Sequence, residues 1–228
     1  MTHSPNDPPA NSRAIVSNQQ GIHENLDAVV KRHLNTRFRR PFPDHSLRTF
    51  EQAAERVTHH QGPLILDSFC GVGESTRFLA AKFPNALVIG IDKSRHRLNK
   101  HETQYPSEVS DNYLLLQADV EDFWRLAVST GWSLSQHYLL YPNPWPKSAH
   151  LKRRVHGSPL FSSLLALGGD IEVRSNWSNY IQEFSAALSI AGYTSNIQTL
   201  TEAKPITPFE RKYRESGHLL WSCTAKLS

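Results

Sequence analysis

From residue 62 onward the sequence alternates short apolar runs with segments of helical periodicity, and this alternation restricts the fold more than any other feature. Leu64-Ile65-Leu66 and the run 86–91 flank a segment, 74–83, in which apolar residues recur at helical spacing. Continuous apolar strands separated by helices are typical of a parallel sheet that is covered on both faces, with right-handed crossovers. The sequence therefore predicts an α/β fold that begins with a βαβ unit.

The same alternation continues to the C-terminus. It predicts strands at 113–117, 137–141, 170–174, 194–200 and 218–225, and helices at 121–130 and 180–191. Upstream of the sheet, helical spacing of apolar residues predicts one helix within 21–38 and a second over 44–60. We therefore expect three parts: a disordered, Pro-rich N-terminal arm (1–20), two N-terminal helices (21–60) and one α/β domain (61–228).

Composition argues against several classes of protein. The longest apolar runs are far shorter than the ~20 residues that span a bilayer, so an integral membrane protein is not expected. Cys70 and Cys223 are the two cysteines of the chain, too few for a disulfide framework or a Cys-type zinc site. The N-terminus has no basic-then-apolar signal pattern. We therefore expect a cytoplasmic location, no metal and no membrane partner.

Acidic residues end three successive predicted strands: Asp67, Asp92 and Asp119. Ligands of doubly wound sheets bind beyond the carboxyl ends of the strands, and the turn glycines Gly71 and Gly73 let the backbone approach a ligand closely. A carboxylate after the second strand can accept hydrogen bonds from both hydroxyls of a ribose, and Asp119 can accept one from an adenine amine. These residues predict a site for a cofactor that contains a nucleoside.

The charge of this turn indicates which cofactor is bound. A dinucleotide fingerprint needs a third glycine where this chain has Thr76. Asp67, at the start of the turn, would repel a pyrophosphate but attract a cation. S-adenosylmethionine carries an ammonium and a sulfonium, so the sequence predicts S-adenosylmethionine as the cofactor.

A stiff loop follows the fourth predicted strand, with the sequence YPNPWPKSAHLKRR over 141–154. Its three prolines fix φ and bias the preceding residues toward extended geometry. A rigid loop at the carboxyl end of a strand can hold Asn143 and Trp145 at the reacting centre.

The net charge of +4 is mild, but the basic residues are concentrated. No acid occurs from residue 147 to residue 158, where the basic side chains are Lys147, His150, Lys152, Arg153, Arg154 and His156. A second segment, 31–48, holds six Lys or Arg and one acid. We expect an anionic substrate to dock on the first segment; the second is either a further contact or a solvated helix end and linker.

The loop, the segment LALGGDIEVRSNW and the terminal PITPFERKY together resemble the tRNA (guanine-N7)-methyltransferase family, over residues 60–228. The resemblance implies a Rossmann-like class I methyltransferase fold. Its sheet would have seven mostly parallel strands with the last one antiparallel, and helices on both faces. It also implies methyl transfer from S-adenosylmethionine to guanine N7 in the variable loop of a tRNA. We expect the phosphates of this tRNA to dock on the basic loop.

The resemblance also assigns roles to single residues. Cofactor positions are matched by Asp67, Asp92, Asp119 and Asn143, with Gly71 and Gly73 in the turn, and Asn143 also matches a catalytic position. Substrate positions are matched by Lys147, Asn176, Thr207, Phe209 and Glu210, and we add Lys152, Arg153 and Arg154 as phosphate contacts. Thr207 and Glu210 are expected to contact guanine, because a carboxylate suits the N1 and N2 hydrogens of its Watson–Crick edge.

Three residues depart from the family pattern. Asn143 replaces a loop aspartate, Asn176 stands where the family commonly has an acid, and Phe69 replaces the first glycine of the cofactor turn. Guanine N7 carries a free lone pair and loses no proton on methylation, so an amide at 143 is compatible with a slower or re-targeted enzyme.

The same departures leave two alternatives open. The N-P-x-W loop also resembles methyltransferases that modify exocyclic amines of RNA, DNA or protein. A cofactor-binding or RNA-binding homologue with weakened catalysis is the other alternative.

Overall fold

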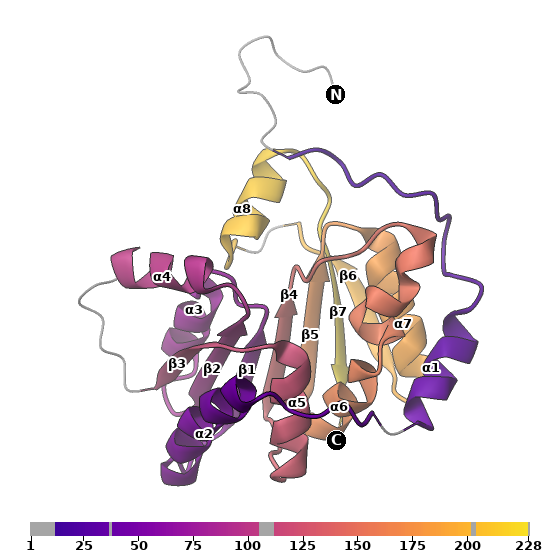
Figure 1. The fold of residues 1–228 in the computed structure, drawn as a ribbon. Helices are drawn as coiled ribbons and strands as arrows, with labels where there is room; N and C mark the ends of the chain where they lie inside the picture. Colours follow the sequence, from indigo (N-terminus) through magenta and orange to yellow (C-terminus); the bar gives the residue numbers. More distant parts are fainter. Residues whose placement is uncertain (1–11, 37, 105–111, 202–203, 228) are drawn as a thin grey trace.

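Seven strands form one sheet at the centre of the computed structural model, which describes residues 12–36, 38–104, 112–201 and 204–227 (Figure 1). The strands are β1 (Leu64–Ser68), β2 (Leu87–Asp92), β3 (Tyr113–Gln117), β4 (Gln136–Leu140), β5 (Asp170–Ser175), β6 (Ser195–Thr199) and β7 (Trp221–Lys226). Their order is β3-β2-β1-β4-β5-β7-β6, and β7 runs antiparallel to both of its neighbours. The expected sheet, mostly parallel with an antiparallel last strand, is confirmed.

Eight α-helices and two short 3₁₀ turns are present in the described residues. They are α1 (Leu26–Leu34), α2 (Asp44–His59), α3 (Glu74–Lys82), α4 (Arg95–Gln104), α5 (Val120–Ser129), α6 (Leu160–Leu167), α7 (Ser178–Ile190), α8 (Pro208–Glu215), η1 (Ser148–Arg153) and η2 (Val155–Gly157). The sequence did not predict α4, α6 or α8. Leu98 is the one aliphatic residue of α4, which leaves no periodicity to detect, whereas α6 is too short and too uniformly apolar to distinguish from a strand.

The helices cover both faces of the sheet. The larger core joins α1, α2, α5, α6 and α7 to one face, with Trp124, Phe161 and Phe184 fully buried in it. A smaller core lies under α3 on the other face, around Leu79 and Val88. Every residue of β1 and β2 is buried, which explains why these strands read as continuous apolar runs.

The region before the sheet packs against α5. Phe50 of α2 meets Phe123 of α5 with ring centroids 5.3 Å apart. Arg40, from the basic segment 31–48, pairs with Glu121 at 2.8 Å and with the buried Asp122 at 2.6 Å. One basic residue of this segment, Arg40, therefore holds the N-terminal region against α5.

The N-terminal arm was expected to be disordered over 1–20. Residues 1–11 lie outside the described residues, whereas residues 12–25 run in irregular backbone across the top of the molecule, from the neighbourhood of α8 to α1 (Figure 1). The described part of the arm makes specific hydrogen bonds, which are given below.

Candidate active site

The carboxylate of Asp67, at the end of β1, is fully buried. Its Oδ2 accepts hydrogen bonds from Ser75 Oγ at 2.6 Å and Thr76 Oγ1 at 2.7 Å. Its Oδ1 is equally buried but has no hydrogen-bond partner among the described residues. The pKa of Asp67 is raised to about 6, chiefly by burial and in smaller part by the charge of Asp92, against the lowering effect of the two hydroxyls. A cationic ligand that donates a hydrogen bond to Oδ1 would therefore stabilise this buried carboxylate.

The turn after β1 lies close against β3. Gly71 and Gly73 have φ of 62° and 76°, and a Cβ on Gly73 would lie 2.5 Å from Leu115 Cδ1. Phe69 also adopts a positive φ, of 64°, a conformation that costs a side-chain-bearing residue about 1–2 kcal/mol. Its ring packs edge-on against Trp124 with centroids 6.3 Å apart. This packing of the Phe69 side chain thus offsets the strain of its positive φ.

Asp92 and Asp119 lie at the ends of β2 and β3. Asp92 accepts hydrogen bonds from the backbone N–H groups of Gly71 at 3.1 Å and Ser94 at 2.8 Å. Arg97 of α4 also donates to Asp92, at 3.1 Å. Asp119 is half-buried and caps α5 by accepting from the Glu121 N–H at 2.9 Å. The expected grouping of the three acids at one edge of the sheet is therefore present, and two of them are oriented by backbone N–H groups.

The loop after β4 is strained, and within residues 141–146 it exposes Asn143. Tyr141 and Trp145 have φ of 58° and 46°. The exposed Asn143 accepts a hydrogen bond from the Trp145 N–H through its side-chain oxygen, at 3.2 Å. Trp145 is half-buried, with the guanidinium of Arg153 4.8 Å from its ring centroid and the ring of His150 perpendicular to it at 5.5 Å.

The basic stretch after this loop divides into two groups. Lys147, Lys152 and Arg153 are exposed, as expected of residues that dock an anion. Arg154 and His156 are fully buried and both contact the carboxylate of Glu183 on α7. The expectation that Arg154 contacts phosphate is therefore wrong, and His156 does not face an anionic substrate either, because the buried Glu183 holds both.

The terminal PITPFERKY segment forms the start of α8, beyond the carboxyl ends of β4 and β5 (Figure 1). Thr207 caps this helix by accepting from the Glu210 N–H at 2.9 Å. Glu210 is fully buried and receives Arg174 Nη1 on both carboxylate oxygens, at 3.2 and 3.0 Å. In this arrangement both side chains have internal partners, so the predicted guanine contact stays untested and requires α8 to rearrange.

Two further predicted substrate residues lie near α8. Phe209 is 41% exposed, and its Cε2 lies 3.9 Å from where a Cβ of Gly71 would be, so the ring covers the cofactor turn. Asn176 is half-buried, with Nδ2 3.0 Å from His218 Nδ1. Of the two, Phe209 is the one that the fold brings to the predicted cofactor site.

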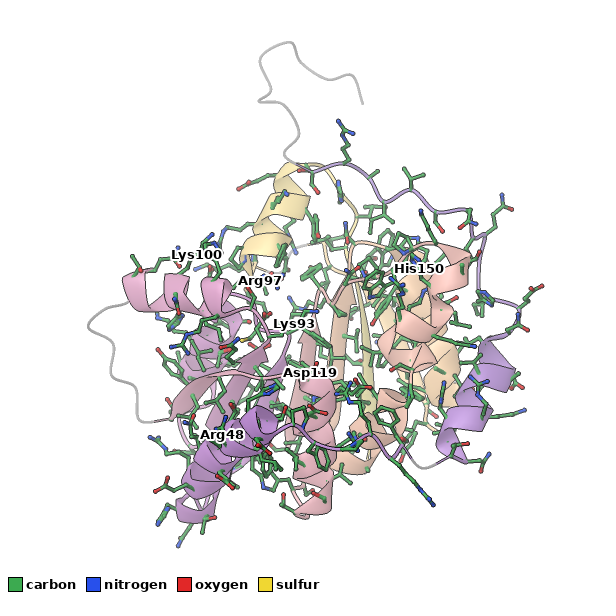
Figure 2. All side chains as sticks on the ribbon, in the orientation of Figure 1. Arg48, Lys93, Arg97, Lys100, Asp119 and His150 are labelled. Carbon is green, nitrogen blue, oxygen red and sulfur yellow. The ribbon has the colours of Figure 1, made fainter. Side chains whose placement is uncertain are left out.

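Sequence reasoning missed two features of the site. Arg211 of α8 forms a two-point ion pair with Glu74 at the start of α3, which fastens α8 beside the cofactor turn. The exposed basic residues Lys93, Arg97 and Lys100 lie on and beside α4, at the edge of the strand ends (Figure 2). The absence of any acid from residue 93 to residue 101 was a signal for the second feature. The first had no local signal.

The described residues contain no group of three or more His, Cys, Asp or Glu side chains that could hold a metal ion. Within the same residues, no helix has the length and apolar character required to cross a membrane.

Curated relatives align with this chain over most of its length. The chain is 28% identical over 168 residues to a tRNA (guanine-N(7)-)-methyltransferase of Pseudoalteromonas atlantica, which covers 70% of each chain. It is also 28% identical over 185 residues to the enzyme of that name in Ectopseudomonas mendocina, which covers 77% of this chain and 75% of the relative. These relatives agree with the family that the loop and terminal motifs indicate.

Solved structures confirm the class I methyltransferase fold. A 16S rRNA (adenine(1408)-N(1))-methyltransferase from Catenulisporales acidiphilia, solved with its cosubstrate SAM, superposes with a TM-score of 0.57 at 14% identity. The superposition covers 78% of this chain and 90% of that one.

A family model described as "Putative methyltransferase" matches residues 61–223, which include every acid at the strand ends, the proline-rich loop and α8. The chain therefore belongs to this family of methyltransferases.

Proposed function

We propose that this protein transfers a methyl group from S-adenosylmethionine to guanine N7 of a tRNA. The observation that carries the proposal is the buried, unpartnered Oδ1 of Asp67 beside Asp92, in a chain similar to enzymes named tRNA (guanine-N(7)-)-methyltransferase. An acidic turn that lacks one hydrogen-bond donor fits a cationic, nucleoside-bearing cofactor and does not fit a pyrophosphate.

Each acid has a distinct role in this proposal. Asp67 holds the ammonium of the methionine end, Asp92 accepts from the ribose hydroxyls, and Asp119 accepts from the adenine amine. Arg97 also donates to the carboxylate of Asp92 and so helps to orient it. When bound, S-adenosylmethionine supplies an electrophilic methyl group on its sulfonium.

The remaining residues orient the base, because N7 already has a free lone pair and no proton has to be removed. Asn143 lies on the loop beside Trp145. Its amide can orient the base, but it supplies no negative charge beside the sulfonium. The exposed residues Lys147, Lys152 and Arg153 supply phosphate contacts. Lys93, Arg97 and Lys100, on and beside α4, supply further ones.

Incubation with labelled S-adenosylmethionine and bulk tRNA, followed by nucleoside analysis, tests the proposal. We expect 7-methylguanosine. An N-methylated amino base as the product would instead establish the exocyclic-amine alternative. Absence of transfer together with retained cofactor binding in calorimetry would show a homologue that has lost turnover.

The phosphate contacts can be tested by salt dependence. Lys152→Ala combined with Arg153→Ala should weaken tRNA binding and reduce the slope of log affinity against log salt by about 2, because each phosphate contact contributes about 0.9. The matched control is Lys82→Ala with Lys226→Ala, two exposed lysines at the opposite end of the sheet. An unchanged slope in the loop variant would contradict docking on this loop.

Asn143→Asp tests the principal departure from the family pattern. A carboxylate oxygen still accepts from the Trp145 N–H, so the loop conformation should persist. Negative charge beside the developing transition state should raise the single-turnover rate severalfold. Asn85→Asp, an exposed change in the turn before β2, controls for the added charge. A rate that does not rise in Asn143→Asp would indicate that this enzyme differs from the family in how it orients the base.

A further inference from the structure

The guanidinium of Arg154 is fully buried behind the proline-rich loop. Its Nε and Nη2 donate to the carbonyl oxygen of Trp145 at 3.2 and 3.1 Å, and Nη2 also donates to that of Lys147 at 3.2 Å. Nη1 pairs with Oε2 of Glu183. Arg154 therefore fixes the backbone of the loop from behind, two residues away from Asn143.

The N-terminal segment completes this network through Gln19. Gln19 Oε1 accepts from Arg154 Nη2 at 2.9 Å, and Gln19 Nε2 donates to Glu183 Oε1 at 2.6 Å. Glu183 Oε1 also accepts from the His23 N–H at 2.9 Å, and Oε2 contacts His156 Nε2 at 3.0 Å. One amide from the arm thus supplies a partner to each member of the buried Arg154–Glu183 pair.

Two more residues of the arm contact the loop directly. Ser17 Oγ donates to the carbonyl oxygen of Pro146 at 2.5 Å. Asn18 accepts from the Ser148 N–H at 3.0 Å and donates to Ser148 Oγ at 3.2 Å. The arm therefore holds the segment 146–148 from outside while Arg154 holds it from behind.

The loop requires such support. Tyr141 and Trp145 both have positive φ, which costs about 1–2 kcal/mol for each residue and persists only where surrounding contacts enforce it. At Trp145 the backbone is held by the two hydrogen bonds from Arg154 to its carbonyl oxygen and by the one that its N–H donates to Asn143.

We propose that Gln19 is a positioning residue for the proline-rich loop. Through Arg154 it keeps Asn143 and Trp145 in the geometry that methyl transfer needs. The inference rests on the proposed function, in which Asn143 orients the target base. Gln19 itself touches no reacting atom. Its effect should therefore fall on the rate of transfer and on the order of the loop, and leave the cofactor site unchanged.

Gln19→Met tests the proposal, because methionine keeps the length of the side chain but forms none of its hydrogen bonds. The matched control is Gln20→Met at the adjacent, exposed position. We expect Gln19→Met to lower kcat five- to tenfold, to leave the cofactor Kd within twofold, and to speed hydrogen exchange of the amides in 143–150. Gln20→Met should match the wild-type protein in all three measurements.

Unchanged exchange in 143–150 for Gln19→Met would overturn the proposal, and so would an equal loss of cofactor affinity and kcat. The exchange measurement needs no substrate, so it decides whether Gln19 orders the loop even if the wild-type protein forms no 7-methylguanosine. Failure of the proposed function and failure of this inference are thus observed separately.

Discussion

Asp67→Asn should lower the affinity for S-adenosylmethionine by about 30- to 100-fold, the effect of losing a charge-assisted hydrogen bond of about 2–3 kcal/mol. The substitution keeps the size of the side chain and an oxygen that accepts from Ser75 and Thr76. What it removes is the negative charge beside the unpartnered Oδ1. Calorimetric titration with the cofactor measures the loss, and Asp170→Asn, an exposed change on β5, is the control.

The same residue should give cofactor binding a pH dependence. Because burial raises the pKa of Asp67 to about 6, the free protein holds a proton there below pH 6, and the cofactor ammonium requires the ionised form. Affinity should therefore be constant above pH 7 and fall about tenfold for each pH unit below 6. The Asp67→Asn variant should show no such dependence. A wild-type affinity that is flat between pH 5 and 7 would contradict the assigned ammonium contact.

Arg154→Met should destabilise the protein by about 3–5 kcal/mol, because it leaves the buried carboxylate of Glu183 without its charged partner. For a chain of this length, thermal unfolding should shift downward by on the order of 10 °C. Arg153→Met, the exposed neighbour on the same loop, should leave the midpoint within about 1 °C. If the two variants unfold alike, the Arg154–Glu183 pair does not stabilise the fold.

The stabilising effect of this pair should also depend on pH. Burial alone would raise the pKa of Glu183, but hydrogen bonds and charge from His156 and Arg154 hold it lowered to about 2. A carboxyl group with a depressed pKa in the folded state stabilises above its unfolded pKa, near 4.5, and loses that contribution as the pH falls toward 2. Denaturant midpoints of the wild-type protein and Arg154→Met should therefore converge as the pH falls through this range.

The grouping of the three acids at the strand ends could be predicted because its signals are local. The carboxyl ends of parallel strands lie at one edge of the sheet, so an acid that ends an apolar strand can be placed at that edge from the sequence. Asp67, Asp92 and Asp119 lie there. The βαβ unit and the antiparallel last strand followed from periodicity and from the family resemblance.

The substrate side was harder to predict because a run of basic residues does not show which members face solvent. Lys152 and Arg153 are exposed, while Arg154, the next residue, is fully buried. The difference comes from Glu183, whose position on α7 is fixed by the apolar face that this helix packs on the sheet. Glu210 likewise depends on a distant partner, because the Arg174 guanidinium of β5 compensates its buried charge.

The order of residues along the chain was enough to predict the seven strands and five of the eight helices of the described residues, the acids at the strand ends and the stiff loop that carries Asn143. Tertiary structure alone decided which charges are available to a ligand. A buried ion pair or hydrogen bond forms between residues that folding brings together, such as Gln19 and Arg154, which are 135 positions apart. Because the cost of burying a charge depends on that distant partner, no local pattern could place Arg154 inside, or join the N-terminal arm to the loop.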